Sequence, residues 1–239
     1  MALVKLTVRS LQFTLMQDLR YPVEFLADLI GSFLWLGVIL FGASQFSSAQ
    51  VQLFATGFLL NVILSEPIGV AVGFLTVRGG SAEEAYCAPV PLPVQLAIQG
   101  AASAVRALIV NSVIYIGMAL LAGFRPTGLL PLLQLTPPLF FASVGVALVV
   151  AGAQLLLKKV QAVSGLIMIL FVGAAFTPTG VLSKVPAWLP FATGLKAANG
   201  GAYNWAEMAL YSLLYAGVGL LIFHGCQRLT VRLGLAGAR

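Results

Sequence analysis

Residues 53–77 read LFATGFLLNVILSEPIGVAVGFLTV, an almost unbroken apolar run with one charged side chain, Glu66. A helix needs about 20 consecutive, mostly apolar residues to cross the hydrocarbon core of a bilayer. This run is long enough, and it lacks the short alternation of polar and apolar residues typical of a membrane β-barrel strand. We therefore predict that it is a transmembrane α-helix.

The composition of the whole chain also indicates a membrane protein. Of its 239 residues, 60% are hydrophobic and 8% are charged, and the mean hydropathy is +1.01. A soluble globular chain is usually about 45–50% apolar and roughly a quarter charged. So few charged side chains could not cover the apolar surface with a polar exterior. We therefore exclude a soluble domain and expect a single, all-α integral membrane domain over residues 1–239.

Five further apolar segments resemble the first one in length and composition. The six predicted membrane spans are 25–44, 53–77, 107–124, 132–157, 162–182 and 206–226.

The N-terminal residues 3–21 have a different pattern, because their apolar side chains recur at the spacing of an amphipathic helix. We expect this helix to lie in the membrane interface, with Lys5, Arg9 and Arg20 toward anionic headgroups. A simple cytoplasmic extension of the first span is the alternative.

The distribution of Lys and Arg predicts the orientation of the chain in the membrane. Three of the thirteen basic residues, Arg125, Lys184 and Lys196, fall on one side of the predicted spans. The other ten lie on the opposite side or beside it, so we assign that side, with both termini, to the cytoplasm. The protein is expected in the cell (inner or plasma) membrane. Topology explains the net charge of +6, and no nucleic-acid partner is expected.

No pattern of residues predicts catalysis or metal binding. The only histidine, His224, stands alone near the end of the last span, and Cys87 and Cys226 lack metal-ligand spacing. A Walker-type glycine loop is absent from the sequence. We therefore expect no catalytic residue, no metal site and no cofactor bound by this chain, which argues against an enzyme.

Glu66 and Pro67 are the most unusual pair within the spans. An ionisable group near the bilayer centre costs about 2.5–3.5 kcal/mol, so it normally faces a bundle interior or a water-filled cavity. Proline removes a backbone donor and can bend a helix. Two interpretations stay open: residues that line or gate a pathway, or a neutral, hydrogen-bonded glutamic acid between helices. Asp28 and Arg106 are expected near the cytoplasmic boundary, where water would stabilise them.

The connection after the second span contains a recognisable motif. Residues 80–89 read GSAEEAYCAP, with Gly80, Glu83, Glu84 and Pro89 at its fixed positions. This resembles the glycine-threonine-leucine-glutamate-glutamine…serine-proline signature of ABC-2 type transporter permeases, the membrane-spanning subunits of ABC exporters. In that family a short cytoplasmic helix follows the signature and leads into the third span.

A second similarity lies after the fifth predicted span. Residues 176–178 and 185–190 read FTP and VPAWLP, and they look like the extracellular re-entrant segment of the same family, which we therefore expect at 183–205. The resemblance covers nearly the whole chain. It departs from the family at Ala85 and Tyr86, where leucines are usual, and after Trp188, where asparagine-proline is missing.

The resemblance implies an export function that depends on partner proteins. ATP and Mg would be bound by a separate ATPase subunit, and segment 78–95, through Gly80, Glu83, Glu84 and Pro89, would couple to it. A second permease subunit, identical or homologous, would complete the pathway as a dimer surrounded by membrane lipids. The alternatives are an ion-gradient-driven secondary transporter that uses Glu66, and a membrane-bound assembly or anchoring protein without transport.

Overall fold

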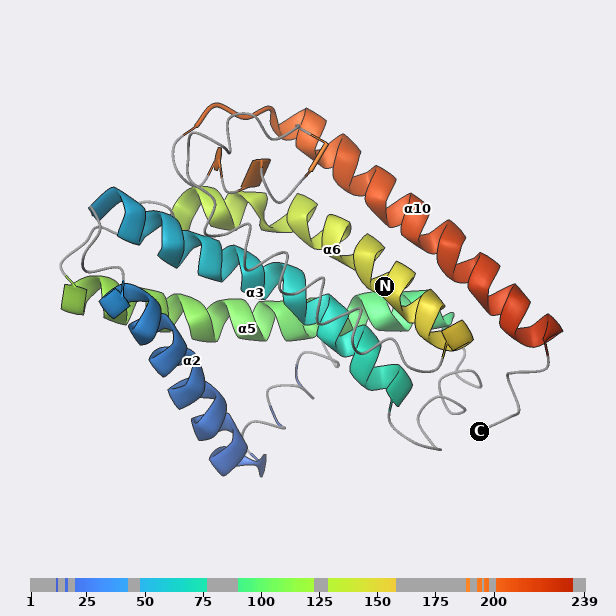
Figure 1. Ribbon diagram of the computed structural model, residues 1–239, viewed down its shortest axis with the longest axis horizontal. Coiled ribbons are helices and arrows are strands. Elements are labelled where there is room, and N and C mark those ends of the chain that lie inside the picture. Colours follow the sequence, from blue (N-terminus) through green and yellow to red (C-terminus); the bar gives the residue numbers. More distant parts are fainter. Residues whose placement is uncertain are drawn as a thin grey trace.

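The computed structural model describes residues 12, 16, 20–42, 48–76, 90–122, 129–157, 188–189, 193–194, 196–197 and 201–233. These residues form helices joined by turns and irregular segments, and none of them belongs to a strand. The five long helices are α2 (Pro22–Gly42), α3 (Ser48–Thr76), α5 (Leu92–Ala122), α6 (Leu129–Leu157) and α10 (Trp205–Arg232) (Figure 1). The prediction of an all-α fold is confirmed for the described residues.

Within the described residues, four helices are long and apolar enough to cross a membrane, which suggests a membrane protein. Their apolar stretches are Ala55–Gly73, Leu92–Gly117, Leu133–Leu157 and Trp205–Arg232, and α2 has a shorter one, Phe25–Leu34. The predicted second, fourth and sixth spans coincide with α3, α6 and α10. The predicted fifth span and most of the predicted re-entrant segment lie outside the described residues. The same is true of the interfacial helix, except for Gln12, Met16 and Arg20, which are helical and exposed.

The start of the third predicted span was wrong. We placed it at residue 107, but α5 begins at Leu92 and continues without a break through Ala122. Pro93 fits in the first turn, where a helix does not need its N–H. The backbone N–H groups of Val94 and Gln95 donate to the carbonyl oxygen of Pro91, at 2.9 and 3.1 Å. The helix therefore starts within segment 78–95, which we predicted to be a cytoplasmic connection.

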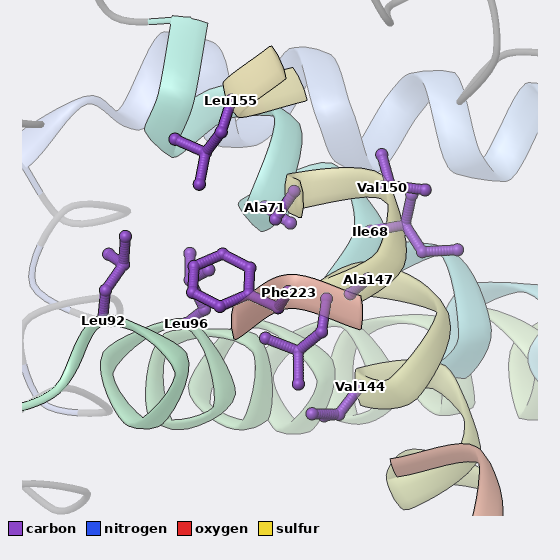
Figure 2. Close-up of a cluster of buried hydrophobic side chains, with 11 residues drawn as sticks. Ile68, Ala71, Leu92, Leu96, Val144, Ala147, Val150, Leu155 and Phe223 are labelled. Carbon is purple, nitrogen blue, oxygen red and sulfur yellow. The ribbon is translucent and has the colours of Figure 1, made fainter. Parts of the chain in front are cut away.

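Helix α6 lies between α3 and α10 at the centre of the described bundle. Helices α3, α6 and α10 run in the same direction, and α5 runs the opposite way (Figure 1). Side chains from these four helices form one buried apolar cluster, in which Phe223 of α10 is fully buried (Figure 2). The other members are Ile68, Ala71, Leu92, Leu96, Val144, Ala147, Leu148, Val150, Ala151 and Leu155.

Glycines allow α6 and α10 to approach until their backbones touch. A Cβ added at Gly219 of α10 would lie 2.2 Å from the carbonyl oxygen of Gly145 in α6. A Cβ added at Gly145 would lie 2.3 Å from the carbonyl oxygen of Tyr215. Small residues permit this kind of close helix packing, which is common inside membranes.

Polar side chains of α6 form hydrogen bonds with the backbone of α3. The hydroxyl of Ser143 donates to the carbonyl oxygen of Leu64 at 2.6 Å, and Nε2 of Gln154 donates to that of Val72 at 3.3 Å. The bond from Ser143 lies in the turn before Pro67, where proline interrupts the helical hydrogen bonds. Such side-chain donors are one reason why proline is tolerated in membrane helices.

Helix α10 begins with a capped turn. Oδ1 of Asn204 accepts hydrogen bonds from the backbone N–H groups of Ala206 and Glu207, at 3.1 and 3.4 Å. Asparagine is a preferred N-cap residue, and an acidic side chain in the first turn, here Glu207, stabilises the positive end of the helix dipole. Helix α10 thus begins one residue before the predicted start of the sixth span, residue 206.

Candidate functional site

A polar cavity of about 240 Å³ lies between α2, α3 and α5. Each of the three helices contributes side chains to its wall. The lining residues are Phe25, Leu29 and Ser32 of α2, Glu66 of α3, and Arg106, Ala107, Val110 and Asn111 of α5. The cavity thus contains the only charged residue of α3 and the only charged residue of α5.

The carboxylate of Glu66 is held by a neighbouring helix. The hydroxyl of Ser103 in α5 donates a short hydrogen bond to Oε2 of Glu66. A hydrogen bond contributes about 0.5–1.5 kcal/mol between neutral groups and about 1.5–3 kcal/mol where the acceptor is charged. This bond therefore fixes the direction in which Glu66 points and ties α3 to α5.

Pro67 and Gly100 allow α3 and α5 to come close enough for that bond. A Cβ added at Gly100 would lie 3.1 Å from Cβ and 3.2 Å from Cα of Pro67. A larger side chain at position 100 would push the proline ring away. Gly100 lies one helical turn before Ser103, so its small size directly determines the spacing of the two helices at Glu66.

Arg106 joins the third wall of the cavity. Its guanidinium carbon, Cζ, lies 5.9 Å from the centroid of the Phe25 ring on α2. A guanidinium within about 6 Å of an aromatic ring is attracted to it, by about 0.5–1 kcal/mol at exposed positions and more where water is excluded. Arg106 therefore links α5 to α2, as Ser103 links α5 to α3.

Asn111 provides an unsatisfied polar atom in the cavity wall. The residue is 7% exposed, and its Nδ2 donates to the carbonyl oxygen of Ala107 at 2.8 Å. Its Oδ1 is buried and has no hydrogen-bond partner within the described part of the chain. Buried polar atoms are normally hydrogen-bonded, and one water occupies about 30 Å³ in the liquid. The cavity can thus hold several waters, or a small polar ligand that donates to Oδ1.

The structure brings together some of the predicted site residues and leaves others outside the described ranges. Glu66 lines a polar cavity between helices, and the adjacent Pro67 is buried. The predicted coupling residues lie outside the described residues, and so do Lys5 and Arg9. These undescribed coupling residues are Gly80, Glu83, Glu84 and Pro89.

Arg106 is the site residue that sequence reasoning missed. We expected it at the cytoplasmic edge of a span, but it lies near the middle of the 31-residue helix α5. A signal was present in the sequence. Ser103, Arg106 and Asn111 recur at spacings that favour one side of a helix, within a run that has no other charge. That pattern indicates a polar face, and the chain offers Glu66 as its charged counterpart.

In the described parts of the chain, no three residues of His, Cys, Asp or Glu gather in one place. The arrangement at the cavity is instead a carboxylate, a guanidinium and an amide oxygen around a water-sized space. Such a set can bind a small polar molecule or couple the positions of three helices.

No protein-family model matches this chain, and no curated protein matches it either. The likeness to ABC-2 permeases therefore rests on the motifs at 80–89 and 176–190 and on the predicted order of spans.

Proposed function

We propose that this chain is the membrane-spanning permease subunit of an ATP-driven exporter of the ABC-2 type. The observation that carries the proposal is the position of the motif GSAEEAYCAP, residues 80–89. In the sequence this motif follows α3 and precedes α5, and α3 ends and α5 begins at the end of the bundle where α6 and α10 also end (Figure 1). An ATPase that docks at this end would meet the motif together with the basic end of α10.

The direction of the helices supports six spans rather than five. Helices α6 and α10 run the same way, so the chain between Leu157 and Trp205 has to return from one end of the bundle to the other. Residues 162–182 are apolar, and as a helix they would extend about 32 Å at 1.5 Å per residue. That length matches the hydrocarbon core of about 30 Å. Six spans, counting α2, leave both termini on the same side.

The two ends of α10 have the features of two membrane interfaces. Trp205 and Tyr203 are exposed at its start, and Arg228 is exposed near its end. From Trp205 to Arg228 the helix rises about 35 Å. Aromatic side chains favour the headgroup level, and basic side chains favour the cytoplasmic side. The motif end of the bundle is therefore proposed to be cytoplasmic, in the cell membrane.

Contacts between α10, α6 and α3 indicate how deep the cavity lies relative to the proposed cytoplasmic interface. Gly152 of α6 faces Cys226 of α10, close to the basic end, and Gln154 bonds to the carbonyl oxygen of Val72 in α3. Val72 thus lies near the proposed interface. Glu66 lies six residues before Val72 in α3, which places it about 9 Å deeper in the bilayer than Val72. The cavity is therefore proposed to lie inside the bilayer, where charged groups usually have a function.

Helix α5 provides a mechanical connection between the motif and the cavity. It continues without a break from Leu92, just after the motif, to Arg106 in the cavity wall. A displacement of segment 78–95 by a partner ATPase would move α5 along or about its axis. That movement would change the contacts of Arg106 with Phe25 and of Ser103 with Glu66, and so open or close α2 against the rest of the bundle. ATP and Mg would stay on the partner.

A second candidate function is a secondary transporter driven by an ion gradient. The observation that favours it is the carboxylate of Glu66 in a polar cavity beside the unsatisfied Oδ1 of Asn111. In that mechanism Glu66 would bind and release the coupling ion. The nearby guanidinium of Arg106 weakens this candidate, because it competes with a cation for the carboxylate.

Two assays separate the candidates. For the exporter, the double variant E83K/E84K should lower the ATPase activity of the purified complex while the helical content of the chain stays unchanged. Lys196→Gln, at the other end of the bundle, serves as the control. For the secondary transporter, the chain alone in proteoliposomes should take up protons, measured with an enclosed pH dye, and Glu66→Gln should stop this. Unchanged hydrolysis in E83K/E84K together with Glu66-dependent uptake would replace our proposal with the second candidate.

A further inference from the structure

The outer face of α10 combines a basic end with an open apolar surface. His224, Arg228 and Arg232 are all exposed and stand four residues apart. Residues at this spacing lie on one face of a helix, one above the other. The two arginines thus present their guanidinium groups on the same line, at the end of a membrane-length helix.

The same line continues along α10 as an exposed apolar stripe. Leu221 and Leu214 lie on it and are 74% and 53% exposed. Between and beside them are Gly217 and Gly225, and a Cβ added at either glycine would meet nothing within 4 Å. Gly217 and Gly225 lie one turn before and one turn after Leu221 and have no side chain. The face is therefore lower at these two positions, where a chain of methylene groups could lie.

The dimensions of this face match one leaflet of a bilayer. From Gly217 to Arg228 the helix rises about 17 Å, and one leaflet contributes about half of the 30 Å hydrocarbon core. An acyl chain beside Gly217, Leu221 and Gly225 would therefore end at the level of Arg228. Its headgroup would lie between Arg228 and Arg232.

The charge of the face determines which lipid fits. Guanidinium groups bind phosphate through paired, charge-assisted hydrogen bonds, and basic residues next to a membrane helix attract anionic lipids. A zwitterionic lipid would bring a positive group close to the same arginines. The exposed apolar stripe and the two cations together favour a lipid with a net negative headgroup over a neutral lipid.

We propose that the face of α10 formed by Leu214, Gly217, Leu221, Gly225, Arg228 and Arg232 binds an anionic phospholipid of the leaflet at the basic end. This site goes beyond the export function and does not depend on it, because it requires only that α10 crosses a membrane. One acyl chain of the lipid would lie along the apolar stripe, and its phosphate would lie between the two arginines.

Lipid binding to the full chain tests the proposal. The purified protein in mild detergent is titrated with phosphatidylglycerol or with phosphatidylcholine, and bound lipid is counted by native mass spectrometry. We expect tighter binding of phosphatidylglycerol by about 30-fold, the combined effect of two cations near an anionic headgroup. Added inorganic phosphate should not displace the lipid, because it has no acyl chain that could contact the apolar stripe.

Three variants assign the binding to this face. R228Q/R232Q should lose the preference for phosphatidylglycerol, and R228K/R232K should retain most of it. Lys196→Gln, an exposed cation outside this face, should bind like the unaltered protein. Thermal unfolding in phosphatidylcholine confirms that the variants fold. Equal affinity for both lipids, or equal loss in the Lys196→Gln variant, would overturn the proposal. A dimer that dissociates in R228Q/R232Q without any dependence on lipid would assign the face to a second copy and overturn it as well.

Discussion

Replacing Gly219 by alanine should loosen the contact between α6 and α10. The added Cβ would lie 2.2 Å from the carbonyl oxygen of Gly145, whereas real Cβ atoms essentially never approach closer than 3.0 Å. The two backbones must therefore separate by about 0.8 Å. A gap of 0.5–1 Å already removes about a quarter to a half of the dispersion energy at each contact.

The expected cost is about 1–3 kcal/mol, the range for overpacking a tight contact. Gly217 provides a matched control on the same helix, because a Cβ added there would meet nothing within 4 Å. Alanine at position 217 should be neutral, or stabilising by up to about 1 kcal/mol through its better helix propensity.

Unfolding of both variants in mixed micelles, followed by circular dichroism at increasing SDS, measures this difference. We expect a lower midpoint for Gly219→Ala than for the unaltered chain, and an equal or higher midpoint for Gly217→Ala. Gly145→Ala should behave like Gly219→Ala, because its Cβ would lie 2.3 Å from the carbonyl oxygen of Tyr215. Equal midpoints for the 217 and 219 variants would refute the backbone contact between α6 and α10.

The other predictions concern the cavity, the helix cap and the motif. Ser103→Ala should destabilise the chain by about 0.5–3 kcal/mol in the same assay, the range from a neutral to a charged acceptor, and less so in a Glu66→Gln background; additive effects would mean that the two side chains are not bonded. Asn204→Ala should cost about 1 kcal/mol and Asn204→Asp almost nothing, and equal midpoints for these two would contradict the cap. E83K/E84K should lower ATP hydrolysis by the complex without changing the unfolding midpoint, and a lowered midpoint would instead indicate a role in folding.

Sequence alone was sufficient for the helices that contain one long apolar stretch. The runs that became α3, α6 and α10 contain few charges, so length and hydropathy were enough to predict them. The start of α5 was misplaced because prolines and glutamines near residue 91 lower the local hydropathy, although Pro93 suits a first turn and Gln95 bonds back to the carbonyl oxygen of Val90 at 2.5 Å. A proline pattern at a helix start and one in a loop look alike in sequence.

The site could be predicted only in part. Glu66 was evident because a lone charge in an apolar run is costly. Its neighbours were not evident, because Ser103 bonds to it and Arg106 shares its cavity only through the packing of α5 on α3, where Gly100 meets Pro67. The spacing of Ser103, Arg106 and Asn111 indicates a polar face of α5, but the apolar residues around that face give no periodicity from which the facing helix could be derived. The contact of Phe25 with Arg106 was therefore beyond prediction as well.

Co-purification tests the central claim, that this chain is the membrane subunit of an ATP-driven exporter, most directly. The tagged chain is extracted from its native membranes in mild detergent, and the proteins that remain bound are identified and assayed for ATP hydrolysis. We predict a nucleotide-binding subunit in equal amount and ATPase activity that survives in detergent. A chain that purifies alone, without hydrolysis, would contradict the proposal and leave Glu66 and its cavity as the centre of a different transport mechanism.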